Sequence, residues 1–386
     1  MITKFNVRKT RNLDRINRIL GIFLRKPAAS CGTDIKAIKN ILIVDFALIG
    51  DMVMDIPFLK AIRKNCPDAH ITMVAMPWAK DILGDQGLID RFVIFNGKDC
   101  LSTPLDWLIR SGHIRSTLRK LNERSYDIAF EPKGDMRHSL FMRLTTSRRT
   151  VSYDYTGGSY LVTDSFHPRI KTEHLIDEKL DILEMAGFDI KGCERVPVLM
   201  LSDKRKRFAE DYRRRIGLRT NVIGLHSGAG TENKLYRHFP EIVGFITGLQ
   251  GIKEGFDFLV FDDEETTETD EICEALDRAG ARYFRVGREL DEFISVLSLC
   301  SHLICNDSAP GHIAAALGIQ VMVIFGPINR ETALPRGDKK VIGISIPMDC
   351  KPCTLPECPR RDNACMEQIP WQMITDGILA LLDRNE

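Results

Sequence analysis

Residues 302–326 read HLICNDSAPGHIAAALGIQVMVIFG. The first six residues form the short apolar run of a buried strand, and Ser308–Gly311 make a turn. An alanine-rich helix follows and stops at Gly318, before a second apolar run, VMVIFG. Strand, helix and strand in this order predict a unit of parallel sheet that is covered by helices.

Short apolar runs alternate with helical patterns along the rest of the chain in the same way. Because these runs are apolar at successive positions, they are typical of strands buried on both faces. The sequence therefore predicts the α/β class, with two doubly wound parallel sheets. The expected strands are 41–46, 70–76, 91–95, 126–131 and 149–154 in the first half, and 221–228, 256–261, 282–286, 302–307 and 321–326 in the second.

A length of 386 residues predicts two domains, and the charged, strand-free segment 201–221 separates the two sets of strands. We expect the boundary near 203–218, and between the domains a cleft at the carboxyl ends of the strands, where ligands bind in such folds. The expected parts are a basic extension (1–40), a first Rossmann-like domain (41–205), a second one (218–365) and a C-terminal helix (366–386).

The composition is that of a soluble globular protein, with a net charge of +1 that argues against nucleic acid as a partner. Eleven irregularly spaced cysteines indicate a reducing compartment, and hence the cytoplasm. No apolar run approaches the roughly 18–20 residues of a membrane span.

Residues 1–26 have apolar residues at helical spacing between arginines and lysines. They could lie on the inner face of the cytoplasmic membrane or dock on the protein, and the sequence leaves both open.

Polar residues crowd the turn within 302–326. Asp307, Ser308, Gly311 and His312 fall where a strand ends and a helix begins, and the N–H groups and dipole of a helix start favour an anion such as phosphate. In the alternative interpretation Ser308 caps the helix and Asp307 stabilises the turn.

A second anion site is predicted in GLHSGAGTENKLYR (224–237). Its strand runs into a turn with Gly228, Gly230 and Thr231, and Lys234 follows. Bare N–H groups, a hydroxyl and a nearby cation suit a diphosphate. The pattern is neither of the standard nucleotide fingerprints, so a glycine loop required by geometry alone is an equal alternative.

In the first half, the turn after the strand 41–46 carries Asp51. An acid at a helix start can be a cap. A carboxylate that faces a diphosphate across a cleft instead suggests a general base that acts on a hydroxyl.

Three stretches taken together resemble the ADP-heptose:lipopolysaccharide heptosyltransferase family (glycosyltransferase family 9). They are LIGDMVMDIPFLKAIRKNCPDAHITMVA (48–75), IGLHSGAGTENKLYRHFP (223–240) and CNDSAPGHIAAALGIQVMVIFGP (305–327). Their order and spacing match over roughly 41–370, and the tail CKPCTLPECPRRDNACMEQI (350–369) is similar to that of the family.

The resemblance implies a GT-B fold and inverting, metal-independent transfer of heptose or a related sugar. The implied donor is an ADP-sugar, which in this family is ADP-heptose, and no cofactor is implied. The implied acceptor is a lipopolysaccharide core or a similar anionic saccharide or glycolipid. It implies that Asp51 is the catalytic base and that Lys234 contacts the donor phosphates. The implied donor-binding residues are Gly228, Gly230, Thr231, Lys234, Glu265 (ribose; Glu264 is the alternative), Leu290 beside Gly287 and Arg288 (adenine), Asp307, Ser308, Gly311 and His312.

The chain departs from the family pattern on the acceptor side, where the segment 131–137 reads EPKGDMR. Lys133, Arg137 and His138 in and after it are consistent with an anionic acceptor. A solvated basic loop is an equal alternative. Ala47 and Leu48 stand where the family often has serines, and Ala309 where it has glycine.

The tail contains four cysteines, Cys350, Cys353, Cys358 and Cys365. They could hold a structural zinc ion, but their spacing is not that of a standard zinc ribbon, and free thiols are the favoured interpretation. Two other functions stay open on the same architecture. One is a nucleotide-sugar epimerase or hydrolase, and the other is a non-catalytic sugar-nucleotide-binding protein of envelope assembly.

Overall fold

The computed structural model describes residue 27 and residues 34–96, 111–167, 174–262, 267–287, 289–353, 355 and 357–383. The chain forms two compact units, Met1–Arg195 and Val196–Glu386. The segment 203–218, where the sequence suggested a boundary, lies inside the second unit. It forms helix α9 (Asp203–Ile216), which packs against α13 (Leu290–Leu297) of the same unit.

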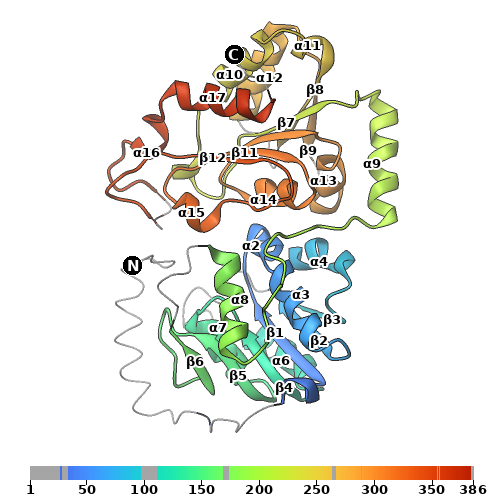
Figure 1. Cartoon of the computed structure of the whole chain (residues 1–386), viewed down its shortest axis with the longest axis vertical. Coiled ribbons are helices and arrows are strands. Elements are labelled where there is room, and N and C mark those ends of the chain that lie inside the picture. Colours follow the sequence, from blue (N-terminus) through green and yellow to red (C-terminus); the bar gives the residue numbers. More distant parts are fainter. Residues whose placement is uncertain are drawn as a thin grey trace. The chain divides into compact units, whose positions relative to one another are not determined.

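The first unit is built on a six-stranded sheet in the order β3-β2-β1-β4-β5-β6 (Figure 1). The neighbouring strands in it pair in parallel. The strands are β1 (Asn40–Asp45), β2 (His70–Ala75), β3 (Arg91–Ile94), β4 (Tyr126–Glu131), β5 (Ser147–Tyr153) and β6 (Asp164–Phe166).

Helices connect these strands and bury the sheet. Residues of α6 and α7 join one core cluster with Leu42 and Val44 of β1. On the other side, α3 packs against α8, and Phe58 of α3 meets Phe130 of β4 with ring centroids 5.9 Å apart. The helices are η1 (Ile35–Ala37), α2 (Ile49–Met54), α3 (Ile56–Asn65), α4 (Trp78–Leu83), η2 (Gly84–Gln86), α6 (Ser111–Leu121), α7 (Met136–Arg143) and α8 (Leu175–Met185).

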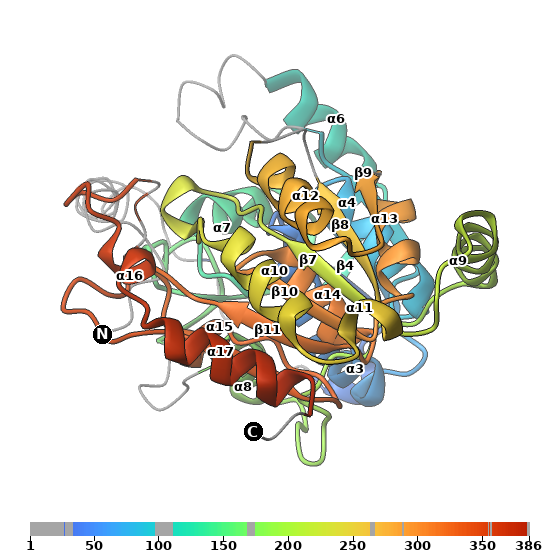
Figure 2. The same cartoon turned by 90° about the horizontal axis from the view of Figure 1, so that it is seen from above.

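The second unit repeats this plan with a parallel sheet in the order β12-β11-β10-β7-β8-β9. Helices α10, α12 and α17 lie over one face of the sheet, and α13 and α14 lie on the other (Figures 1 and 2). The strands are β7 (Val222–His226), β8 (Asp257–Asp262), β9 (Tyr283–Gly287), β10 (His302–Asn306), β11 (Gln320–Ile324) and β12 (Val341–Ile344). The remaining helices are η3 (Glu232–Lys234), α10 (Phe239–Gly248), α11 (Ile252–Gly255), α12 (Thr267–Ala279), α14 (Ala309–Ala316), α15 (Arg330–Ala333), α16 (Ala364–Glu367) and α17 (Trp371–Leu381).

The strand order reverses once in each sheet, and this reversal determines where ligands can bind. The reversal falls between β1 and β4 in the first unit and between β7 and β10 in the second. At such a point the loops after the two neighbouring strands leave on opposite faces of the sheet, which opens a crevice at the carboxyl ends. Asp51 follows β1, and Lys234 and Asp307 follow β7 and β10.

All ten strands that the sequence predicts are confirmed, with ends that differ by at most two residues. The two strands that the prediction missed are β6 and β12, which form edges of their sheets. An edge strand pairs on one side only, so it needs less of the apolar pattern that marks a central strand. Within the described ranges, no helix is both long enough and apolar enough to span a membrane.

Candidate functional site

The crevice of the second sheet is bordered by the loop after β7 and the turn after β10. The Lys234 ammonium reaches across and lies 2.7 Å from Oδ2 of Asp307. Asp307 is buried, whereas about a quarter of the Lys234 side chain is exposed. The pair thus fixes a cation at the surface of the crevice, where it can meet an anionic ligand.

Asn306, the last residue of β10, connects this strand to the glycine-rich loop after β7. Its Nδ2 donates to the carbonyl of Ser227 at 2.5 Å, and its Oδ1 accepts from the backbone N–H of Tyr236 at 3.2 Å. Asn306 is fully buried. One side chain therefore bonds both ends of the glycine-rich loop, which gives that loop a defined conformation without a ligand.

The turn after β10 leads into α14 without a side-chain cap. Ser308 is the N-cap residue, but its hydroxyl donates to the carbonyl of Asn306 at 3.2 Å and makes no capping bond. The capping role that we considered for Ser308 is therefore absent. A Cβ at Gly311 would lie 3.2 Å from Sγ of Cys305, so the helix start packs closely on β10, and His312 is buried behind it.

The glycine-rich loop has room on its outer side. Gly230 has no positive φ, and a Cβ added there would meet no atom within 4 Å. Packing inside the unit therefore does not require glycine at this position, whereas close approach of a ligand to the backbone would. Thr231 donates from Oγ1 to Oδ1 of Asn233 at 2.7 Å, and Gly228 lies in the same loop.

The nucleoside side of the predicted site is described in part. Leu290 is the half-buried first residue of α13, and Gly287 ends β9. Glu264, Glu265 and Arg288 lie outside the described residues.

In the first unit, Asp51 lies in the first turn of α2 with about 28% of its side chain exposed. Leu48 occupies the N-cap position, and its own side chain makes no capping bond. Lys133, from the loop after β4, places its Nζ 4.0 Å from Oδ2 of Asp51. The crevice between β1 and β4 thus holds a carboxylate beside a cation.

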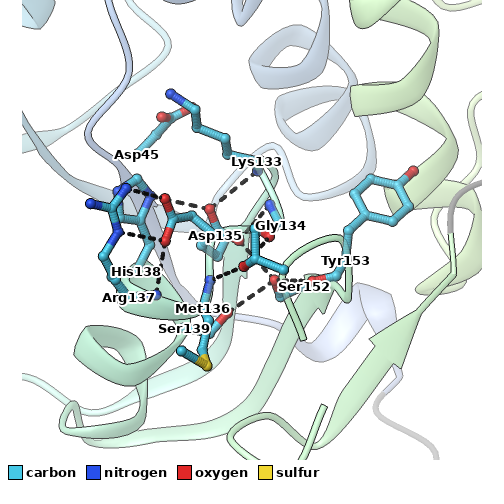
Figure 3. Close-up of polar contacts among 12 residues, drawn as sticks. Asp45, Lys133, Gly134, Asp135, Met136, Arg137, His138, Ser139, Ser152 and Tyr153 are labelled. Carbon is cyan, nitrogen blue, oxygen red and sulfur yellow. Dashed lines mark hydrogen bonds and ion pairs between the residues drawn. The ribbon is translucent and has the colours of Figure 1, made fainter. Parts of the chain in front are cut away.

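The loop 131–137 is organised around the buried carboxylate of Glu131. Its oxygens accept hydrogen bonds from the N–H groups of Lys133 (3.2 Å) and Gly134 (2.8 Å) and from the hydroxyl of Ser152 (2.7 Å). Nδ1 of His138 lies 3.3 Å from the same carboxylate. Figure 3 shows Lys133, Gly134, His138 and Ser152 in one cluster of polar contacts. Glu131 therefore determines the path of the backbone that presents Lys133 to Asp51.

The other two basic residues of this segment, Arg137 and His138, differ in how far they are exposed. His138 is buried against Glu131, and only Lys133 and Arg137 are partly exposed. The Arg137 guanidinium forms two bonds to Asp135, from Nε to Oδ1 at 3.0 Å and from Nη2 to Oδ2 at 2.5 Å. Burial alone would raise the pKa of Asp135, but the bonds from Arg137 and the charge of His138 hold it below its usual range. The segment is thus an ordered, ion-paired loop rather than a freely solvated one.

Three buried polar residues of these crevices were absent from the sequence predictions: Asn306, Glu131 and Lys179. Glu131 ends a predicted strand and Asn306 is the residue before the end of another, so a polar residue near the close of an apolar run was a usable signal. Lys179 lies in the middle of α8, where lysine is an ordinary helix residue, so the sequence carried no signal for its burial.

The four tail cysteines do not form the zinc site that their spacing allowed. All four are described and are free thiols, and no group of three or more potential metal ligands is gathered among the described residues. Cys350 is exposed, whereas burial raises the pKa of the Cys365 thiol. The basic segment 1–26 lies outside the described residues.

Comparisons with known proteins agree with this architecture. Residues 114–362 match the family model of glycosyltransferase family 9 (heptosyltransferase). Lipopolysaccharide heptosyltransferase 2 of Salmonella typhimurium is 21% identical over 315 residues, which cover 78% of this chain and 86% of that protein. Lipooligosaccharide heptosyltransferase 2 of Campylobacter jejuni is 27% identical over 85 residues, and that match spans only 27% of its length.

Among solved structures, E. coli ADP-heptose lps heptosyltransferase II aligns with a TM-score of 0.67 at 18% identity. The alignment covers 89% of this chain and 98% of that one. This likeness confirms the expected fold, the two Rossmann-like units of GT-B proteins. Because the family model covers more than half of the chain, this protein belongs to glycosyltransferase family 9.

Proposed function

We propose that this protein transfers heptose from ADP-heptose to a saccharide of the lipopolysaccharide core. Membership of glycosyltransferase family 9 and the similarity to heptosyltransferases support the reaction class. The observation that carries the proposal is the second-unit crevice, where the Lys234–Asp307 pair lies between an open glycine-rich loop and an uncapped helix start. The Lys234 cation, the N–H groups of the loop and the dipole of helix α14 together suit a diphosphate.

In this proposal the second unit holds the donor. Lys234 and the N–H groups of Ser308 and Ala309 at the start of α14 bind the diphosphate, and Gly228, Gly230 and Thr231 line the other side. His312 lies in the first turn of the same helix and supports the sugar end of the site. Leu290 borders the adenine, and Glu265 meets the ribose.

Asp51 is the proposed catalytic base. Its carboxylate takes the proton of an acceptor hydroxyl while that oxygen attacks the anomeric carbon. The bond from this carbon to the phosphate oxygen breaks, and ADP leaves with the electron pair. Attack opposite the leaving group inverts the anomeric configuration. Lys234 and the loop N–H groups stabilise the negative charge that grows on ADP, an effect worth about 3 kcal/mol per preorganised donor.

No divalent ion is needed in this scheme, because Lys234 and the N–H groups supply the positive charge themselves. We therefore expect transfer to continue in EDTA. A rate that EDTA abolishes and Mg²⁺ restores would contradict this part of the proposal.

The acceptor site is proposed at the first-unit crevice. Lys133 and Arg137 are exposed enough to contact an anionic saccharide, while His138 supports their loop from inside.

We place the protein in the cytoplasm, with residues 1–26 on the membrane surface. Deletion of 1–26 should abolish co-sedimentation with vesicles that contain anionic lipid, and unchanged co-sedimentation would refute membrane contact.

A thermal-shift panel tests the donor site. We expect ADP and ADP-heptose to raise the melting temperature more than UDP, GDP or CMP, and Asp307→Ala to remove this effect because Lys234 loses its partner. Stabilisation by a different nucleotide would keep the transferase activity but assign the protein a different sugar donor. No stabilisation by any of them would favour a protein without transferase activity.

A further inference from the structure

A buried lysine lies beneath the turn that carries Asp51. Lys179 extends from α8, and only about 7% of its side chain is exposed. Its Nζ donates to the backbone carbonyl of Asp51 at 3.3 Å, forms an ion pair with Asp55, and lies 3.7 Å from Oδ2 of Asp45. One ammonium group therefore contacts three acidic residues of the first unit.

These three acids lie along one continuous part of the backbone. Asp45 ends β1, Asp51 lies in α2, and Asp55 joins α2 to α3. Neither carboxylate oxygen of Asp45 accepts a hydrogen bond from the described residues. A buried carboxylate without hydrogen bonds is costly, so the Lys179 charge is what compensates it.

The charge of Lys179 is maintained by these neighbours. Burial alone would lower its pKa, but the carboxylates of Asp55, Asp45 and Asp51 outweigh burial and raise the pKa above its ordinary value. Lys179 is thus a permanent cation at any pH at which an enzyme would work. Packing alone does not explain a lysine at this position. A neutral residue could fill the same space, but it would not bind three acidic residues.

We propose that Lys179 is a positioning residue for the base: it fixes the turn that carries Asp51 and favours the ionised form of that carboxylate. This inference rests on the proposed function, in which Asp51 takes the acceptor proton. Lys179 touches neither donor nor acceptor in this account and acts only through Asp51.

Several charged groups lie around Asp51. Lys133 and Lys179 bring positive charge near its carboxylate, and Asp45 and Asp55, which share Lys179 with it, carry negative charge. Helix α4 packs against α2 and carries Lys80 and Asp81. Lys179 is the deepest of the cations, so its field is the least screened by solvent.

The test is the pH profile of kcat for Lys179→Met. The variant removes a positive charge beside the Asp51 carboxylate, so the acid limb of the profile should move up by about one pH unit. We expect kcat to fall at least about tenfold, while the Kd for ADP stays as in wild type, because the donor residues lie in the other unit. Lys179→Arg should restore most of kcat. Lys60→Met is the matched control, because Lys60 forms an exposed pair with Glu194 in the same unit.

Lys179→Met leaves two buried acids without a cation and can fail to fold. The double variant Lys179→Met/Asp55→Asn removes the charges of both close partners and leaves only Asp45 without its cation, so it is expected to lose less stability than Lys179→Met. It should still show reduced kcat, because the bond to the Asp51 carbonyl is lost. A folded double variant with wild-type kcat and pH profile would overturn the proposal. A wild-type protein that transfers no sugar would instead refute the proposed function.

Discussion

The Lys234 ammonium lies 2.7 Å from Oδ2 of Asp307 and joins the loops that follow β7 and β10 in the second sheet. The contact links residues 73 positions apart in the sequence. It places a cation at the reversal of strand order, where a crevice is expected in this topology.

Lys234→Met should weaken ADP binding about 10- to 100-fold, since a hydrogen bond to a charged group contributes about 1.5–3 kcal/mol. Isothermal titration with ADP measures this loss. Lys60→Met, which removes an exposed lysine of the first unit, should leave the Kd for ADP unchanged. An unaltered Kd in Lys234→Met would remove this residue from the donor site.

Asn306→Ala should both destabilise the second unit and weaken ADP binding. The variant leaves the Ser227 carbonyl and the Tyr236 N–H without their buried partner, at a cost of about 1–3 kcal/mol in the free energy of unfolding. Urea titration gives the stability and calorimetry gives the affinity.

Asn122 offers a matched control for that variant. It also bonds one carbonyl and one N–H, those of Leu144 and Thr146, but it is exposed and belongs to the first unit. Asn122→Ala should cost less stability and leave ADP binding intact. Equal effects of the two substitutions on ADP affinity would show that Asn306 does not organise the donor loop.

Glu131→Gln should raise KM for the acceptor about tenfold and leave KM for the donor unchanged. Three donors bond the Glu131 carboxylate: the N–H groups of Lys133 and Gly134 and the hydroxyl of Ser152. Gln has a single acceptor oxygen, so it cannot accept from all three. The loop would then present Lys133 less accurately. Glu123→Gln, at an exposed pair with Arg91, serves as control. A changed donor KM would argue for a general loss of structure.

Asp135 should make the first unit sensitive to acid. Its pKa is held below the usual range in the folded state, so its stabilising contribution is present above about pH 4, the unfolded value, and is lost as pH falls through the folded pKa. Asp135→Asn keeps a good N-cap for α7 but removes the charge. The free energy of unfolding of the variant should fall less steeply between about pH 4 and pH 2 than that of the wild type. Parallel curves would exclude a role for this carboxylate.

The sequence predicted much of this arrangement because its signals are local. Apolar runs mark central strands, and Asp307, Ser308 and Gly311 follow one of them directly. The contacts that give these residues their geometry are not local. Lys179 meets Asp51 across 128 positions, and its burial depends on how α8 packs against α3. The edge strands β6 and β12 were missed for the related reason that partial exposure weakens the apolar pattern.

The central claim is that Asp51 drives sugar transfer from ADP-heptose to an acceptor. The most direct measurement is mass spectrometry of a heptose-deficient lipopolysaccharide core after incubation with ADP-heptose and either wild type or Asp51→Asn. We predict one added heptose per acceptor with wild type. With the variant we predict a rate at least about 100-fold lower at unchanged ADP affinity, the range for loss of a general base. Near-normal transfer by Asp51→Asn, or release of free heptose by wild type without any modified acceptor, would contradict the account.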